Sequence, residues 1–374
     1  DLETLTGRRP VTLLGREWQF RPGAVGSRDW ERSRLAALYA LAQGDAPVVV
    51  ATADGLMART LPPETLRSLA ITLEVGGQAE LGALAEQLLS AGYTRCEQVE
   101  GVGQFALRGG ILDVFSPLMD QPVRCEFFDD EIDSMGAFDP GTQRRTRNVS
   151  SARILPAAEV LPHCAPGGLP GLADQLTALA EKLAKKQKTE AIVQTLREDA
   201  ERLRSGAAPG AADRYLAAIY PTVTAGVHYL PPDAVVFLSE SGRVDERVKN
   251  TVLQQKQDVE ALLSAGVLAG EYAHLTLTAE ELYAALEDFP VILEDSLPTS
   301  RHPLRPRGLL TMNAKQLSSY GGSLETAVTD LEHYRSSGSA VLVLCGGETR
   351  AKNLHRLLEE KGIPATLDLS GAAM

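Results

Sequence analysis

Nucleotide binding is the first chemistry to test, because much of the chain alternates strand-like and helical patterns. A phosphate-binding loop needs glycines for close backbone approach, a lysine, and a serine or threonine for Mg²⁺. The pattern GxxxxGK[ST] occurs nowhere in the 374 residues. Gly346 and Gly347 follow a strand pattern and open a helix, where an anion could bind, but the lysine of the motif is missing. We interpret them as a plain strand-to-helix turn.

A metal-binding carboxylate after a buried strand is the second candidate. Residues 235–238 read VVFL, and Ser239 and Glu240 follow. Ser239 stands where an aspartate would be needed to hold Mg²⁺. Glu240 could orient a water molecule, but it has no phosphate loop or metal ligand to act with. Ser239 and Glu240 are therefore predicted to be a degenerate metal and ATPase position.

Other reactive residue types are scattered. The run DDEID at residues 129–133 lacks the spacing of a calcium loop, so a solvated hairpin turn is preferred and a cation site is the open alternative. The six histidines show no HxxxH spacing or adjacent catalytic partner, so no metal site and no catalytic residue is predicted. The four cysteines form no CxxC motif. They are interpreted as buried thiols of a cytoplasmic protein.

Composition limits the remaining choices. The chain is 44% hydrophobic and 23% charged, which is ordinary for a globular protein, and its net charge is −12. Non-specific nucleic-acid binding by the whole surface is disfavoured, although a local basic patch is not excluded. No apolar run approaches the roughly 20 residues of a membrane span, so no membrane contact is expected.

The remaining function is recognition of a partner by the protein surface, and residues 103–145 have the sequence pattern that indicates it. Residues 122–128 alternate, with Arg124, Glu126 and Phe128 on one face of a strand, and Arg108 lies on the polar phase of residues 104–108. Arg124 and Phe128 would lie roughly 13 Å apart. Arginine with an exposed aromatic is the composition of an interaction hot spot. The alternative is that Phe128 is core and the arginines pair with Glu126 or Asp113.

The elements that position these residues suggest a mixed α/β chain. Strands are predicted at 11–14, 47–52, 104–107, 111–115, 122–128, 235–238, 290–293 and 340–344, and those at 47–52, 235–238 and 290–293 should be buried. Helices are predicted at 29–41, 54–60, 78–91, 172–203, 324–336 and 348–362, with the lysines of 182–188 on a solvated face. Four parts are predicted: 1–72, 73–153 (a small α+β module), 154–308 and 309–374.

Three segments then point to a known family. The segments FALRGGILDVFSP, PVRCEFFDDEIDSM and FDPGTQRR resemble the N-terminal module of the bacterial transcription-repair coupling factors (Mfd). That module is itself similar to the first domains of the excinuclease component UvrB. The resemblance extends to SRDWERSRLAALYALAQGDAPVVVATADGLM and to NAKQLSSYGGSLETAVTDLEHYRSSGSAVLVLCGG, and so covers most of the chain.

The resemblance implies a degenerate helicase-like domain of the P-loop NTPase type, in two sequence pieces. These would be residues 1–72 and 154–308, interrupted by an inserted domain at 73–153 and followed by the start of a third α/β domain at 309–374. In the family the inserted domain binds UvrA, another component of the excinuclease. The family's contact residues fall on Arg108, Arg124 and Phe128, the residues that alternation places outside.

The resemblance also implies what this chain lacks. RNA polymerase binding and an ATP- and Mg-dependent translocase motor on double-stranded DNA would lie beyond Met374, so no cofactor is expected here. The degenerate phosphate loop would precede Asp1, and the chain is expected to be a fragment. Residues 15–34 lack the DNA-clamping hairpin of UvrB. In the family, the intramolecular C-terminal domain can mask the inserted domain.

Two functions are therefore weighed. The first is a non-catalytic adaptor that recruits UvrA to lesions where RNA polymerase has stalled, in nucleotide excision repair. The second is an ATP-dependent DNA-binding repair enzyme like UvrB. The second needs a phosphate loop and a metal carboxylate, and neither pattern is present.

Overall fold

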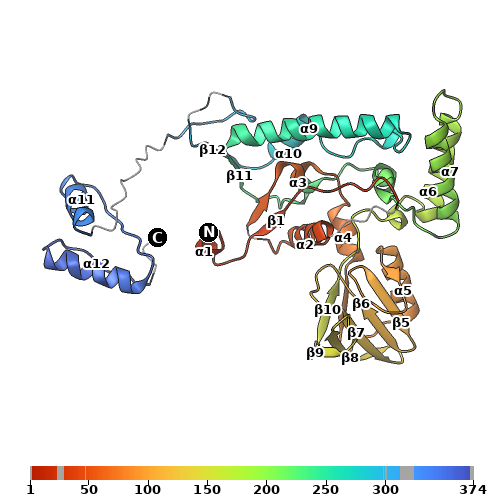
Figure 1. Ribbon diagram of the computed structural model, residues 1–374, viewed down its shortest axis with the longest axis horizontal. Helices are drawn as coiled ribbons and strands as arrows, with labels where there is room; N and C mark the ends of the chain where they lie inside the picture. The colour runs from red at the N-terminus through yellow and green to blue at the C-terminus, as the bar shows by residue number, and fades with distance from the viewer. Residues whose placement is uncertain are drawn as a thin grey trace. The chain divides into compact units, whose positions relative to one another are not determined.

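The larger of two compact units holds most of the chain. The computed structural model describes residues 2–22, 29–46, 48–297, 299, 301–311 and 324–370. The units are residues 1–307 and 308–374. The larger unit combines an α/β part with an α+β part that is built on a six-stranded sheet (Figure 1). The described residues include no helix long and apolar enough to cross a membrane.

Two separate parallel strand pairs underlie the α/β part. β1 (Val11–Leu13) pairs with β2 (Val49–Ala51), and β11 (Val236–Ser239) pairs with β12 (Val291–Glu294). Parallel pairing requires long crossover connections, which contain helices here. The helices of this part, besides the α6 and α7 pair, are α1 (Leu2–Thr6), α2 (Asp29–Gln43), α3 (Ala53–Met57), α4 (Pro63–Leu69), α8 (Leu216–Ile219), α9 (Ser241–Ser264) and α10 (Ala279–Leu286). Short 3₁₀ turns are η1 (Pro162–Cys164), η2 (Ala212–Tyr215), η3 (Gly226–Tyr229) and η4 (Gly270–Tyr272).

The strands predicted to be buried are only half covered. Phe237 on β11 and Ile292 on β12 are register partners, and they remain 62% and 46% exposed. Leu238 on the opposite face is buried, and Val236 packs into the core that contains α9 and α10. Val50 on β2 is also 44% exposed. The strand positions are confirmed, but their full burial was wrong, because the described helices cover one face of these two-stranded sheets.

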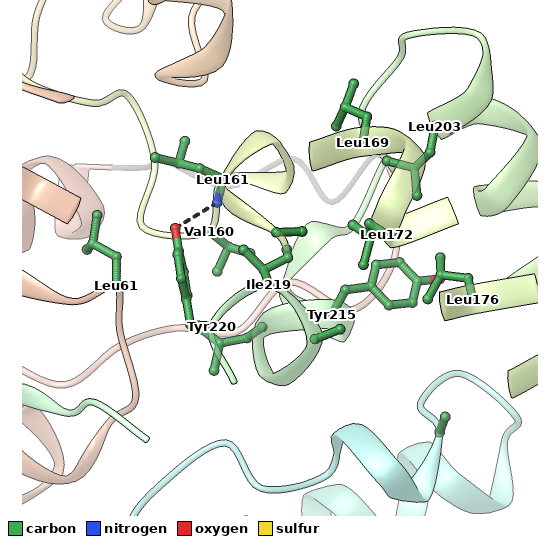
Figure 2. Close-up of a cluster of buried hydrophobic side chains, with 14 of the residues drawn as sticks. Leu61, Val160, Leu161, Leu169, Leu172, Leu176, Leu203, Tyr215, Ile219 and Tyr220 are labelled. Atoms are coloured by element: carbon green, nitrogen blue, oxygen red, sulfur yellow. Dashed lines mark hydrogen bonds between the residues drawn. The ribbon is translucent and has the colours of Figure 1, made fainter. Parts of the chain in front are cut away.

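The predicted helix at 172–203 is two helices. α6 (Gly168–Leu183) and α7 (Glu190–Arg204) form an antiparallel pair, and residues 184–189 reverse the chain between them. Lys188 adopts a left-handed φ of 62° in this turn. Reversal lets the leucines of both helices share one core, whereas a single straight helix would expose half of them. Figure 2 shows Leu169, Leu172 and Leu176 of α6 near Leu203 of α7. The lysines therefore belong largely to a turn.

The α+β part is an almost continuous meander. Its six-stranded sheet has the order β4-β5-β6-β7-β8-β9, antiparallel except for the β4–β5 pair. The strands are β4 (Thr94–Arg95), β5 (Gln104–Arg108), β6 (Ile111–Val114), β7 (Val123–Phe128), β8 (Glu131–Phe138) and β9 (Arg145–Asn148). β3 (Ile71–Glu74) and β10 (Ser151–Ile154) form an antiparallel pair where the chain enters and leaves this part. α5 (Leu81–Ser90) packs on one face.

A buried ionic cluster joins the α+β part to the body. Glu159 follows β10 and is fully buried. Its two carboxylate oxygens lie 2.9 and 3.1 Å from Nε of Arg34 on α2, and Oε2 lies 3.4 Å from Nη1 of Arg16. Thr60 donates its hydroxyl to Oε2 at 2.6 Å. Nearby, the Tyr220 hydroxyl accepts the Leu161 amide (Figure 2).

Further contacts from α2 strengthen this junction. Arg32 donates to the carbonyls of Pro117 and Met119, at the base of the six-stranded sheet. Glu31 accepts the backbone amide of Glu159 at 2.9 Å. Burial alone would raise the pKa of Glu159, but Arg34 and Arg16 outweigh burial and hold that pKa below its usual value. The junction therefore depends on Glu159 being ionised.

The smaller unit contains α11 (Leu324–Ser336) and α12 (Glu348–Glu360), and both predicted helices are confirmed. Its described residues contain no strand, so the prediction of a strand at 340–344 was wrong. That segment includes Leu342 and Leu344, which are 64% and 70% exposed. A strand needs a neighbour to bond its backbone, and none lies beside it in the described residues. Gly347 does cap α12 as a plain turn. The polar segment at 313–323 lies outside the described residues.

We predict that Glu159→Gln lowers the free energy of unfolding by about 3–5 kcal/mol, because it removes the buried carboxylate that pairs with Arg34 and that shares the buried Arg16 with Asp213. Urea unfolding at pH 7 measures this loss. Glu271→Gln is the control, since Glu271 pairs with Lys182 on the surface and should cost less than about 1 kcal/mol.

The same variant should alter the acid response. The pKa of Glu159 is lower in the folded chain than its ordinary value of 4.5. Ionised Glu159 therefore stabilises the folded state fully above about pH 4.5, and this stabilisation is lost as the pH falls through the folded pKa. Between pH 6 and pH 3.5 the native chain should lose more stability than Glu159→Gln. Parallel losses would contradict an ionised Glu159 at the junction.

Candidate protein-docking face

The six-stranded sheet has an inner face and an outer face. The inner face packs on α5 and buries Phe105, Leu112, Val114, Val123, Cys125 and Met135. The opposite side is called the outer face. It has a smaller apolar cluster, which consists of Val99, Ala106, Phe115 and Phe138. The rest of the outer face includes several charged and polar side chains.

Strand register aligns the charged residues in two rows. Directly paired residues on neighbouring strands share a face of the sheet. One row across β5 to β8 is Arg108, Ile111, Glu126 and Ser134, and the next is Ala106, Asp113, Arg124 and Gly136. Asp113 is therefore placed between the two arginines predicted from the sequence.

Asp113 binds both arginines. Its side chain is fully buried, and its Oδ1 and Oδ2 accept from Nε and Nη2 of Arg124 at 2.7 and 2.8 Å. Oδ2 also accepts from Nη2 of Arg108 at 2.6 Å. The bidentate geometry is the strong form of a charged hydrogen bond. The hydrogen bonds with Asp113 are the main reason that the pKa of Arg124 is raised. One carboxylate thus fixes two guanidinium groups.

Arg124 is also embedded in the loop after β8. Its guanidinium lies 4.6 Å from the centre of the Phe138 ring and donates to Gln143 at 3.4 Å. Gln143 in turn donates to the carbonyls of Val99 and Pro140. The Arg124 side chain is 21% exposed, whereas that of Arg108 is 47% exposed. Arg108 therefore offers more of its guanidinium to a partner, and Arg124 also orders the surrounding loop.

Phe128 ends β7 at the tip of the β7–β8 hairpin and is 81% exposed. The register shift after Glu126 places the extra residue, Asp133, on β8, so β7 keeps its alternation. Backbone hydrogen bonds to residues outside the hairpin hold both its β7 strand and its turn. The Phe127 amide donates to Gly110 at 2.7 Å, and the Ala79 amide donates to the carbonyl of Asp130 at 2.8 Å. An exposed aromatic ring thus stands on a well-anchored backbone.

The sequence predictions for this face have a mixed outcome. Phe128 is exposed, so its alternative placement in the core is wrong. The alternative that the arginines pair with Asp113 is correct, but both keep exposed surface. Glu126 instead accepts from Ser134 at 2.8 Å. Sequence reasoning missed the role of Gln143, whose long-range contact with Arg124 has no local signal.

Ser239 is the last residue of β11, one residue beyond the predicted strand end, and Glu240 follows it as the N-cap of α9. Ser239 is exposed, and Glu240 takes a left-handed φ of 55° before α9. The Glu240 carboxylate accepts from Ser296, and the neighbouring Ser241 donates to Asp295 at 2.8 Å. The carboxylate is therefore engaged in a hydrogen bond between two loops. Whether the position is a degenerate ATPase site stays a prediction.

The other candidate residues, namely the acidic run at 129–133 and the cysteines, form no metal or catalytic site within the part of the chain that the structure describes. Residues 129 and 130 form the turn of the β7–β8 hairpin. Among the described residues, no group of three or more histidine, cysteine, aspartate or glutamate side chains could hold a metal ion. All four cysteines are free thiols, but only Cys125 is buried and the other three are partly exposed, so the prediction that all four are buried was wrong. Burial raises the pKa of Cys125 to about 12, so this thiol is unreactive at neutral pH.

Comparison with known proteins finds similarity in the same region and along most of the chain. Residues 71–159 match the UvrB interaction domain. The whole chain is 27% identical to a transcription-repair-coupling factor of Bacillus subtilis over 378 residues, and 88% of it is 30% identical to one of Myxococcus xanthus. A Staphylococcus aureus relative is 25% identical over 90% of the chain. The chain spans 32%, 28% and 28% of these relatives. These matches confirm the resemblance seen in the sequence.

We predict that Asp113→Asn lowers the free energy of unfolding by about 1–3 kcal/mol, since it removes a buried, hydrogen-bonded charge. Asp133→Asn is the matched control, because Asp133 lies exposed in the same sheet and should change stability by less than about 0.5 kcal/mol. Chemical unfolding of both variants compares them. Equal midpoints would show that Asp113 does not hold the face together.

Proposed function

We propose that this chain, similar along its length to the transcription-repair-coupling factors, is an adaptor that binds the excinuclease component UvrA through the outer face. It would recruit UvrA to DNA lesions at stalled RNA polymerase, in nucleotide excision repair. The observation that carries the proposal is Phe128, which is 81% exposed on the same face of the sheet as Arg108 and Arg124 and lies within the residues that match the UvrB interaction domain. Aromatic and arginine side chains are enriched in binding hot spots.

Rigidity supports a docking role for this face. Binding loses less free energy when the contact residues are already ordered. Asp113 holds both guanidinium groups. The hairpin of Phe128 is anchored by backbone hydrogen bonds, one donated to the carbonyl of Gly110 and one donated by the amide of Ala79. The three contact residues thus need little rearrangement on binding. Arg108 keeps exposed guanidinium surface for a carboxylate or carbonyl of the partner.

A non-catalytic role for the α/β part also belongs to this proposal. We infer a helicase-like scaffold that has lost nucleotide chemistry, since Ser239 stands at the position where an aspartate would hold the metal. The engagement of Glu240 with Ser296 supports a structural role for this carboxylate.

The rest of the coupling activity would reside in other parts of a longer protein. The relatives are named for coupling transcription to repair. RNA polymerase binding, ATP-driven translocation on double-stranded DNA and masking of the outer face by a C-terminal domain are proposed for those parts. This chain would contribute the contact with the excinuclease.

The double variant Arg108→Ala/Phe128→Ala should bind purified UvrA at least 100-fold more weakly, since each hot-spot side chain contributes about 2 kcal/mol or more. Adding Arg124→Ala should weaken binding further. Biolayer interferometry measures the affinities, and thermal unfolding checks the fold.

Phe237→Ala is the matched control. Phe237 is the other strongly exposed phenylalanine, at 62%, and lies on β11. Its removal should leave affinity within twofold. A folded double variant that binds like the native chain would exclude the outer face as the docking site.

The chain should hydrolyse no ATP, with or without DNA, because it has neither phosphate loop nor metal-binding aspartate. Phosphate release over the buffer background measures turnover. Turnover that Glu240→Gln abolishes would instead support an ATP-dependent enzyme like UvrB. Turnover unchanged in that variant would indicate a contaminant.

A further inference from the structure

A third arginine lies on the outer face, on the edge strand β9. Arg145 is the register partner of Phe138, and its side chain lies back across β8. Its Nη1 donates to the Ser134 hydroxyl at 3.3 Å, and its Nη2 donates to the carbonyl of Met135. The guanidinium is thus oriented by neutral acceptors alone, and no carboxylate of the described residues forms an ion pair with it.

Gly136 makes room for this guanidinium. A Cβ at Gly136 would overlap the Nε, Cζ and Cδ atoms of Arg145, and no other side chain or backbone atom is among the three nearest. Gly136 is also the direct neighbour of Arg124 across β7 and β8. The small residue therefore allows Arg145 to lie flat beside the row that contains Asp113 and Arg124.

The charges on this face contrast with those of the chain. The net charge is −12, yet Arg108, Arg124 and Arg145 share the outer face on alternate strands β5, β7 and β9. The Arg145 backbone lies two strands from β7, but its guanidinium lies over Gly136 of β8, one strand spacing of about 4.8 Å from Arg124. Asp113 pairs with the first two arginines, and Glu126 of the same face accepts from the Ser134 hydroxyl that Arg145 also contacts. Of these three arginines, Arg145 is the one that forms no ion pair with a described carboxylate.

We propose that Arg145 is a fourth contact residue of the docking face and binds a carboxylate on the partner. This inference rests on the proposed function, because the partner is taken to be UvrA. A planar guanidinium held by neutral acceptors keeps its charge and free N–H donors for a bidentate carboxylate. The partner surface opposite β8 and β9 should accordingly be acidic.

The test compares affinities of the full chain for UvrA at low salt. Arg145→Ala should weaken binding about tenfold, the effect of one charge-assisted hydrogen bond. Arg147→Ala is the matched control, since Arg147 is exposed on the same strand but pairs with Ala137, toward the inner face. It should stay within twofold.

A second variant separates position from charge. Gly136→Ala retains every arginine but displaces the Arg145 guanidinium, so it should weaken binding nearly as much as Arg145→Ala. In the Arg145→Ala background, Gly136→Ala should add nothing. Thermal unfolding confirms that each variant is folded.

The outcomes distinguish this inference from the proposed function. If Arg108→Ala/Phe128→Ala abolishes binding while Arg145→Ala and Gly136→Ala leave it unchanged, the role of Arg145 is overturned and the docking proposal stands. If Arg145→Ala weakens binding while Arg108→Ala/Phe128→Ala leaves it unchanged, the contact residues proposed from Arg108 and Phe128 are wrong. No binding by the native chain would overturn both proposals.

Discussion

The buried carboxylate of Asp113 is the interaction on which the outer face depends. Arg108 on β5 and Arg124 on β7 repel each other across β6 and, without an anchor, would move freely in solvent. A single fully buried acid gives them one orientation, with three N–H donors within 2.8 Å of its oxygens. Arg124 then extends this order to Phe138 and Gln143. The charged groups of the outer face are thus held by the fold of the sheet itself.

A second buried acid determines how this sheet is connected to the body. Glu159 lies just beyond β10 and meets Arg34 of α2 and Arg16, with Thr60 completing its hydrogen bonds. α2 also contacts the sheet base through Arg32. Because all these groups lie in the larger unit, the outer face belongs to a sheet that is firmly joined to the α/β part.

Local patterns predicted the features that depend on local rules. Period-two alternation placed Arg124 and Phe128 on one face, since β7 is regular through its exposed end. The pattern could not reveal the sharing of Asp113, which depends on the register of three strands. The turn near Lys188 was missed because both helices have continuous helical composition. The burial of Phe237 was overestimated because an apolar strand reads the same whether one face or both are covered.

Amide hydrogen exchange of the full chain can locate the surface that UvrA is proposed to cover. Exchange would be measured with and without saturating UvrA. We expect slower exchange in the exposed tips of the β5–β6 and β7–β8 hairpins and along β9, with α9 and β11 unchanged. Protection confined to α9, β11 or the smaller unit, with the outer face exchanging as before, would contradict this expectation.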